Sequence, residues 1–145
     1  MTKDAIRDRI IEGMKAAGLK LTSQRLAVID VLAGTRTHPS AAAIYAEAKK
    51  KAPTVSLSTV YLTLDALKRA GLIKELEFDD RDSRYEADVS DHLNLVCQEC
   101  GAIEDFPAAP PAPAERVERR TGFKVSGARL EYYGSCRRCS PRKTA

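Results

Sequence analysis

Two cysteine pairs constrain the fold of this chain more than any other feature. Cys97-x-x-Cys100 and Cys136-x-x-Cys139 place four thiols in the C-terminal half. Two such pairs can supply the four corners of a tetrahedral zinc site, with sulfur about 2.3 Å from the metal. Two disulfides, or one redox-active pair, are the alternatives. The charged start of the chain and the lack of a long apolar run predict a cytoplasmic protein without membrane contact, which favours structural zinc.

Length and charge distribution point to two small parts with different partners. A chain of 145 residues suits one compact domain or two small ones, each with a marginal core, so a metal would help the cysteine-bearing half to fold. Residues 1–79 carry 13 Lys/Arg and 9 Asp/Glu, a net charge of +4, whereas residues 80–145 carry 11 of each. This predicts an N-terminal part that faces a polyanion such as nucleic acid and a C-terminal part that contacts protein. An ordinary solvated surface is the alternative.

Apolar periodicity and capping residues predict four short helices within the first 70 residues. The first helix ends at Gly18, and Thr22, Ser40 and Ser56 can cap the other three. The first helix carries apolar residues at helical spacing, namely Ile6, Ile10, Met14 and Ala17. On the fourth helix, the residues expected to form one apolar stripe are Leu57, Val60, Leu64 and Leu67.

A β-hairpin is expected next, formed by residues 72–78 and 84–86 around a polar turn at 79–83. Helices followed by a hairpin make a winged helix-turn-helix, in which the fourth helix enters the major groove of DNA. Tyr61 lies on the flank of that helix, where it faces DNA or packs under the wing. The residues predicted to contact DNA are Lys15, Lys20, Arg25, Ser56, Ser58, Thr59, Tyr61 and Leu62.

The second half has short β-like runs around one helix near 114–120. The runs are 93–97, 102–106, 123–126 and 130–134, and the proline-rich segment 107–113 is expected to be extended surface. The predicted fold is therefore α+β, with an N-terminal winged helix-turn-helix domain and a C-terminal α/β dimerisation domain that holds structural zinc. The expected boundaries are 1–85 for the first domain, a hinge at about 80–90, 91–140 for the second, and a tail at 141–145.

The only two histidines, His38 and His92, each lie beside a break in the predicted elements. Carboxylates and an amide surround His92 in the sequence, among them Glu86, Asn94 and Asp105. Two imidazoles with two or more carboxylates form a mixed nitrogen and oxygen site that suits Fe(II), Mn(II) or Zn(II). The alternative is that both histidines are plain polar residues.

A series of motifs along nearly the whole chain is similar to the ferric uptake regulator (Fur) superfamily. They are Gly18-Leu-Lys-Leu-Thr-Ser-Gln-Arg25, His38-Pro-Ser-Ala, Ser58-Thr-Val-Tyr61, Gly71-Leu-Ile, Arg84-Tyr85, Cys97-x-x-Cys100-Gly and Gly122-Phe-Lys-Val. Details such as Ser83-Arg-Tyr-Glu86, Ser90-Asp-His92 and Ile103-Glu-Asp-Phe106 resemble its peroxide-responsive branch, PerR, most closely.

The resemblance implies a homodimeric repressor that binds AT-rich inverted repeats in double-stranded DNA. It assigns the four cysteines to structural zinc and puts a regulatory Fe(II) or Mn(II) site between the two domains. The ligand positions of that site fall on His38, Glu86, His92, Asn94 and Asp105. In the peroxide-responsive branch, an iron-bound histidine is oxidised and DNA is released, and the candidates for oxidation here are His38 and His92.

The sequence departs from the family pattern at Asn94, where a His-x-His pair is usual. An amide oxygen is a poorer ligand than imidazole for Fe(II) or Zn(II), although it suits Mn(II). A regulator of the same family that responds to iron, manganese or haem availability is therefore an alternative, as is a DNA-binding protein without metal sensing. A zinc enzyme is disfavoured, because four cysteines leave zinc no open position.

Overall fold

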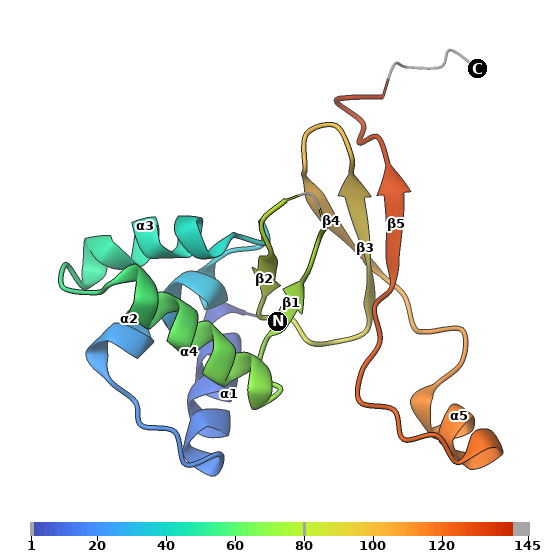
Figure 1. The fold of residues 1–145 in the computed structure, drawn as a ribbon, viewed down its shortest axis with the longest axis horizontal. Coiled ribbons are helices and arrows are strands. Elements are labelled where there is room, and N and C mark those ends of the chain that lie inside the picture. The colour runs from blue at the N-terminus through green and yellow to red at the C-terminus, as the bar shows by residue number, and fades with distance from the viewer. Residues whose placement is uncertain (1, 80, 141–145) are drawn as a thin grey trace. The chain divides into compact units, whose positions relative to one another are not determined.

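A computed structural model describes residues 2–79 and 81–140, which divide into two compact units at Val89 and Ser90. The first unit contains four helices and a two-stranded sheet, and the second contains a three-stranded sheet and one helix (Figure 1). This arrangement confirms the predicted α+β fold class. The predicted tail at 141–145 lies outside the described residues. Within the described chain, no helix is both long and apolar enough to cross a membrane.

The helices of the first unit are α1 (Lys3–Ala16), α2 (Ser23–Gly34), α3 (Ala41–Lys51) and α4 (Leu57–Arg69). The predicted caps are confirmed, since the side chains of Thr22, Ser40 and Ser56 each accept a hydrogen bond from a backbone N–H in the first turn that follows. Gly18 has a φ of +71°, which lets the chain leave α1 in the left-handed conformation.

One apolar core joins these helices, and its most deeply buried side chains include Ile10, Ile29, Ile44 and Leu64. The predicted stripe on α4 is partly wrong, because Leu57 is 42% exposed. Leu57 is the first residue of the helix, and the buried face continues instead through Thr63, which is 2% exposed. Thr63 tolerates burial because its hydroxyl donates to the carbonyl oxygen of Thr59 at 2.7 Å.

The wing of the first unit is the antiparallel pair β1 (Lys74–Leu76) and β2 (Arg84–Glu86). The hairpin is confirmed, with shorter strands than the sequence predicts. Strand β2 also contacts the chain before α3, since Tyr85 N–H donates to the carbonyl of Pro39 at 2.9 Å and Ser40 forms a β-bridge with Arg84. The wing therefore supports the loop that carries His38.

The second unit is built on β3 (His92–Cys97), which pairs antiparallel with β4 (Ile103–Pro107) and parallel with β5 (Glu131–Gly134). The parallel pairing needs a crossover, and α5 (Ala114–Thr121) lies within it, as predicted. The predicted strand at 123–126 is wrong. The described sheet has the order β4-β3-β5, so this segment has no strand beside it, and Phe123 is 67% exposed.

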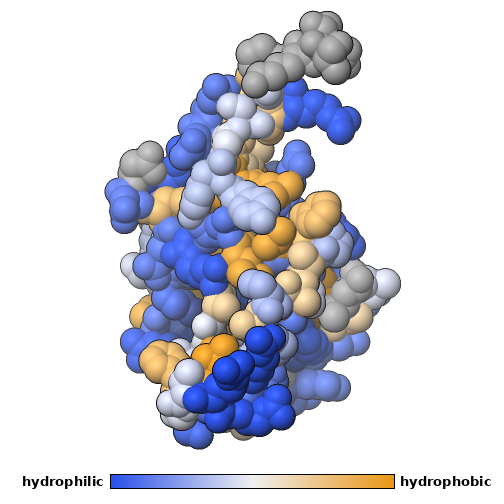
Figure 2. Space-filling view, turned by 90° about the vertical axis from the view of Figure 1, so that its right-hand side faces the viewer, coloured by the Kyte–Doolittle hydropathy of each residue, from blue (hydrophilic) through white to orange (hydrophobic). Residues whose placement is uncertain are grey.

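The core of the second unit is small. Among its described residues, the buried apolar side chains are Val96, Cys97 and Ile103. Large aromatic side chains of the same unit lie open instead, namely Phe106, Phe123, Tyr132 and Tyr133. Figure 2 shows apolar side chains at the surface among polar ones. A unit with so little buried apolar area needs additional stabilisation from a metal or from a second chain.

Candidate metal centres and nucleic-acid surface

The four cysteines lie together in the second unit as free thiols. Their sulfur atoms all lie within 4.8 Å of one another, and Cys100 Sγ lies 3.7 Å from Cys136 Sγ. The edge of a tetrahedron of thiolates around zinc is about 3.8 Å, given a Zn–S distance of about 2.3 Å. The cluster therefore has the dimensions of a closed zinc site. It joins the turn after β3 to the segment after β5.

Backbone N–H groups stabilise the thiolate form of one of these cysteines, which is the form that binds a metal cation. The N–H groups of Cys100 and Cys136 donate to Cys97 Sγ at 3.5 and 3.3 Å, and these bonds lower the pKa of Cys97 to about 6. The pKa of Cys139 is instead raised to about 12, because its thiol makes side-chain hydrogen bonds to Cys136 and Cys100. Four clustered thiolates repel one another, so the site needs a divalent cation to ionise fully.

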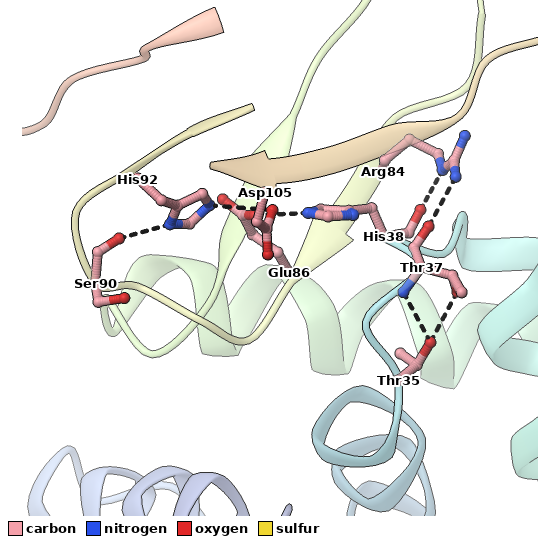
Figure 3. A network of polar contacts seen from close by, with 8 residues as sticks. All are labelled: Thr35, Thr37, His38, Arg84, Glu86, Ser90, His92 and Asp105. Atoms are coloured by element: carbon pink, nitrogen blue, oxygen red, sulfur yellow. Dashed lines mark hydrogen bonds and ion pairs between the residues drawn. The ribbon is translucent and has the colours of Figure 1, made fainter. Parts of the chain in front are cut away.

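The first unit holds one imidazole beside a carboxylate. His38 Nε2 lies 3.1 Å from Glu86 Oε2, and both side chains are almost fully buried. His38 precedes α3 in a loop, whereas Glu86 ends strand β2 (Figure 3). His38 has a φ of +54°, in the left-handed region that residues other than glycine rarely adopt. Burial of a carboxylate with an imidazole at this distance suits a cation that binds both.

The second unit holds a similar pair. His92 Nε2 lies 3.5 Å from Asp105 Oδ1, and the two residues are contributed by the neighbouring strands β3 and β4. The Nδ1–H group of His92 donates to the carbonyl oxygen of Ser90 at 2.8 Å (Figure 3). This bond fixes the tautomer with a lone pair on Nε2, which is the form that binds a metal.

Asn94 lies on the same strand as His92 and pairs in register with Asp105. Alternation along β3 puts the side chains of His92 and Asn94 on the same face, and both are buried. Asn94 is 5% exposed, and its Oδ1 has no hydrogen-bond partner among the described residues. A buried amide oxygen without a donor is costly, so a cation ligand is a natural partner for it.

The candidate DNA-contact residues all belong to the first unit. On α4, Tyr61 is 52% exposed and Leu62 is 68% exposed, which argues against the alternative that Tyr61 is a core residue under the wing. Ser58 is also exposed, whereas Thr59 is half-buried. A groove of about 570 Å³ runs past Tyr61 and Leu62 to the wing, where Asp82, Ser83 and Tyr85 line it.

The other candidates lie at or before the starts and ends of helices. Lys15 is exposed in the last turn of α1. Arg25 is half-buried in the first turn of α2 and donates to the carbonyl oxygen of Lys20 at 2.7 Å. Ser56 caps α4, where its hydroxyl also lies 2.9 Å from Thr59 Oγ1. Lys20 and Arg25 are therefore brought together by the structure, as are Ser56 and Thr59.

Sequence reasoning missed the contacts that hold His38. Arg84 Nε donates to the carbonyl oxygen of His38, and its NH2 group donates to the carbonyl oxygen of Thr37 at 3.0 Å (Figure 3). One sequence feature could have indicated these contacts: Arg84 lies two residues before the candidate ligand Glu86 on the predicted strand. The left-handed φ of His38 left little signal, because only a few per cent of residues other than glycine adopt it, although His does so more often than most.

A winged helix, two imidazole–carboxylate pairs and a four-thiol cluster define a two-domain, metal-binding protein of the winged-helix class. The model of the ferric uptake regulator family matches residues 16–133. The chain belongs to the ferric uptake regulator family.

Individual relatives agree with that assignment. The chain is 39% identical to the peroxide operon regulator of Bacillus subtilis (strain 168) over 134 residues, which are 92% of each chain. The solved ferric uptake regulator of Helicobacter pylori, described as having three functional metal binding sites, is 28% identical, with a TM-score of 0.71 over 99% of this chain and 97% of that one. The peroxide stress regulator of Campylobacter jejuni is 30% identical, with a TM-score of 0.68 over 89% of this chain and 98% of that one.

Proposed function

We propose that this protein is a metal-dependent transcriptional repressor that releases DNA when peroxide oxidises a histidine ligand of its bound iron. The observation that carries this proposal is the presence, in a member of this family, of one imidazole–carboxylate pair in each unit, with both imidazoles buried. The similarity to a peroxide operon regulator supports peroxide as the signal, in preference to metal availability.

The four cysteines Cys97, Cys100, Cys136 and Cys139 hold structural zinc in this proposal. Their spacing and their sulfur distances fit a closed tetrahedral site, and the small core of the second unit gives that site a stabilising role. With all four positions taken by protein, the zinc is not available for catalysis. The peroxide reaction consumes the protein as a reactant, so the protein is not an enzyme.

The regulatory site comprises the two pairs together with Asn94, namely His38, Glu86, His92, Asn94 and Asp105. Two imidazoles with carboxylate and amide oxygens suit Fe(II) or Mn(II). Two of these residues lie before Val89 and three lie after Ser90. A cation bound by all of them fixes the angle between the units, with the hinge at about 80–90, and so favours the DNA-binding form.

The DNA surface comprises the exposed side of α4 and the basic residues of α1, of α2 and of the segment between them. Exposed Ser58, Tyr61 and Leu62 are suited to contacts with base edges and phosphates, and Lys15, Lys20 and Arg25 are suited to phosphates. The exposed aromatic side chains of the second unit support a homodimer, which would present two winged helices to an AT-rich inverted repeat.

Fe(II) held by His38, Glu86, His92, Asn94 and Asp105 would activate hydrogen peroxide for transfer of one oxygen atom to a coordinating imidazole, and in the net reaction the oxidised ring supplies the two electrons that reduce the peroxide. In the net reaction, a ring C–H of His38 or His92 becomes C–OH or its oxo tautomer, while the remaining oxygen of peroxide leaves as water. The modified ring binds the metal less well. The metal is then released from the residues of both units, and DNA affinity falls.

Mass spectrometry of the Fe(II)-loaded protein after peroxide treatment tests this proposal. We expect a mass increase of about 16 Da on the peptide that contains His38 or His92, with loss of DNA binding at the same peroxide dose. The Mn(II)-loaded protein is the matched control and should remain unmodified, because Mn(II) does not reduce peroxide in the same way. Unmodified histidine peptides in the iron-loaded protein, with DNA binding retained, would overturn the peroxide response.

A further inference from the structure

The loop that carries His38 is held from one side by the wing. Arg84 donates through Nε to the carbonyl oxygen of His38 and through NH2 to that of Thr37, the latter at 3.0 Å. Both bonds are charge-assisted, and the planar guanidinium fixes the directions of two successive carbonyl groups. Figure 3 shows both contacts on the same side of the loop.

The conformation that these bonds hold is unusual. His38 has a φ of +54°, and it is the one residue other than glycine with a positive φ in the part of the chain that the structure describes. Such a conformation persists only when surrounding contacts impose it. The threonine side chains contribute from the other end, because Thr37 N–H donates to Thr35 Oγ1 at 3.2 Å and the two hydroxyl oxygens lie 2.8 Å apart.

The same strand that holds the loop also supplies the carboxylate. Glu86 follows Arg84 by two residues on β2, and its Oε2 lies 3.1 Å from His38 Nε2. Tyr85, between them, donates its N–H to the carbonyl oxygen of Pro39 at 2.9 Å. Three consecutive residues of the wing strand therefore hold this loop. Arg84 and Tyr85 bind backbone carbonyl groups at and beside His38, and Glu86 lies against its imidazole.

From this geometry we infer that Arg84 is a positioning residue, which imposes the left-handed backbone at His38 and so presents the imidazole beside Glu86 for metal binding. The inference rests on the proposed function, because it concerns the regulatory metal. It also ties the wing to the site mechanically: a displacement of β2 moves the backbone of His38 and the carboxylate of Glu86 together.

Two arginine variants test the inference by a direct measurement of the backbone. Arg84→Gln removes both the charge and the planar guanidinium. Arg84→Lys keeps the charge and much of the aliphatic side chain, but its single ammonium group cannot replace a guanidinium that binds two carbonyl groups. In the zinc-loaded protein without a second metal, the one-bond Cα–Hα coupling of residue 38 distinguishes positive from negative φ. We expect the wild-type protein to show a positive φ and both variants to lose it.

Titration with Mn(II) supplies the second measurement. We expect affinity to fall about tenfold or more in Arg84→Gln and by a smaller factor in Arg84→Lys, with zinc content unchanged in both. Arg81→Gln is the matched control, because it removes the same kind of charge from the turn of the same wing, where Arg81 lies 6.0 Å from the ring centroid of Phe78. It should keep both the positive φ at residue 38 and wild-type affinity.

The outcomes separate this inference from the proposed function. If Arg84→Lys and Arg84→Gln keep the positive φ and bind Mn(II) within twofold of the wild-type protein, Arg84 is not a positioning residue and the inference is wrong. If the wild-type protein binds no second divalent metal beyond zinc, the proposed function fails. The Cα–Hα coupling in the zinc-loaded protein still decides whether Arg84 sets the backbone of His38.

Discussion

At the scale of single residues, Asn94 is the proposed ligand that departs from the family pattern. Its side chain is buried on the same face of β3 as His92, and its Oδ1 meets no hydrogen-bond donor among the described residues. A buried amide oxygen without a hydrogen-bond donor lowers the stability of the fold unless a cation binds it. In the proposed site it is the weakest of the five donors.

Changing this donor should change metal affinity in either direction. We expect Asn94→His to tighten Fe(II) or Zn(II) binding by about tenfold, or about 1.4 kcal/mol, because imidazole is the better ligand for both metals. Asn94→Leu, which has the same branching at Cγ and no oxygen, should weaken Mn(II) binding. Competitive titration with a metal-sensitive dye measures both effects.

Leu93→His is the matched control for this pair of variants. It adds a histidine one position earlier on β3, where strand alternation turns the side chain to the other face. Affinity for a second metal should then stay at the wild-type value. Equal affinities in Asn94→His, Asn94→Leu and wild-type protein would show that Asn94 is not a ligand.

At the scale of the elements, the start of α4 combines a structural role with a candidate DNA contact. Ser56 accepts a hydrogen bond from Thr59 N–H at 3.1 Å and caps the helix, whereas Ser58 is exposed within the first turn. Ser56→Ala should lower the free energy of unfolding by about 1 kcal/mol, because the first turn loses its cap. Urea denaturation followed by circular dichroism measures this loss.

Ser58→Ala removes the same hydroxyl group two positions later and is the control for stability. It should leave the free energy of unfolding within about 0.5 kcal/mol of the wild-type value, since an exposed hydroxyl contributes little to the fold. Its effect should be seen in DNA affinity instead. Equal destabilisation by both substitutions would contradict the capping role of Ser56.

The elements also show where local sequence information is sufficient. The caps at Thr22, Ser40 and Ser56 were predictable, because a capping side chain bonds to the backbone three residues away. The burial of Thr63 in place of Leu57 was not, since apolar spacing alone cannot show that Thr63 satisfies its hydroxyl within its own helix. The wrong strand at 123–126 has a similar cause: β propensity does not reveal whether a partner strand is available.

At the scale of the whole molecule, the sequence could predict the candidate ligands of each proposed metal site but not the contacts that hold them. Cysteine spacing was sufficient to select the four thiols, whereas His38 and His92 were selected as ligands only through the resemblance to a known family. The left-handed backbone of His38 and the bonds from Arg84 depend on residues 46 and 47 positions apart in the chain, so local patterns carry no trace of them. The tautomer of His92 likewise depends on a carbonyl group, which every residue possesses.

The central claim is that one divalent metal couples the two units to DNA binding and that iron makes this coupling sensitive to peroxide. The most direct test is a titration of DNA affinity by fluorescence anisotropy, with zinc-loaded protein and duplexes selected from AT-rich inverted repeats. Fe(II) under anaerobic conditions and Mn(II) are compared, each before and after hydrogen peroxide. We expect both metals to tighten DNA binding and peroxide to reverse the effect of Fe(II) alone. DNA affinity that is independent of added metal, or an iron-loaded complex that survives peroxide unchanged, would contradict the claim.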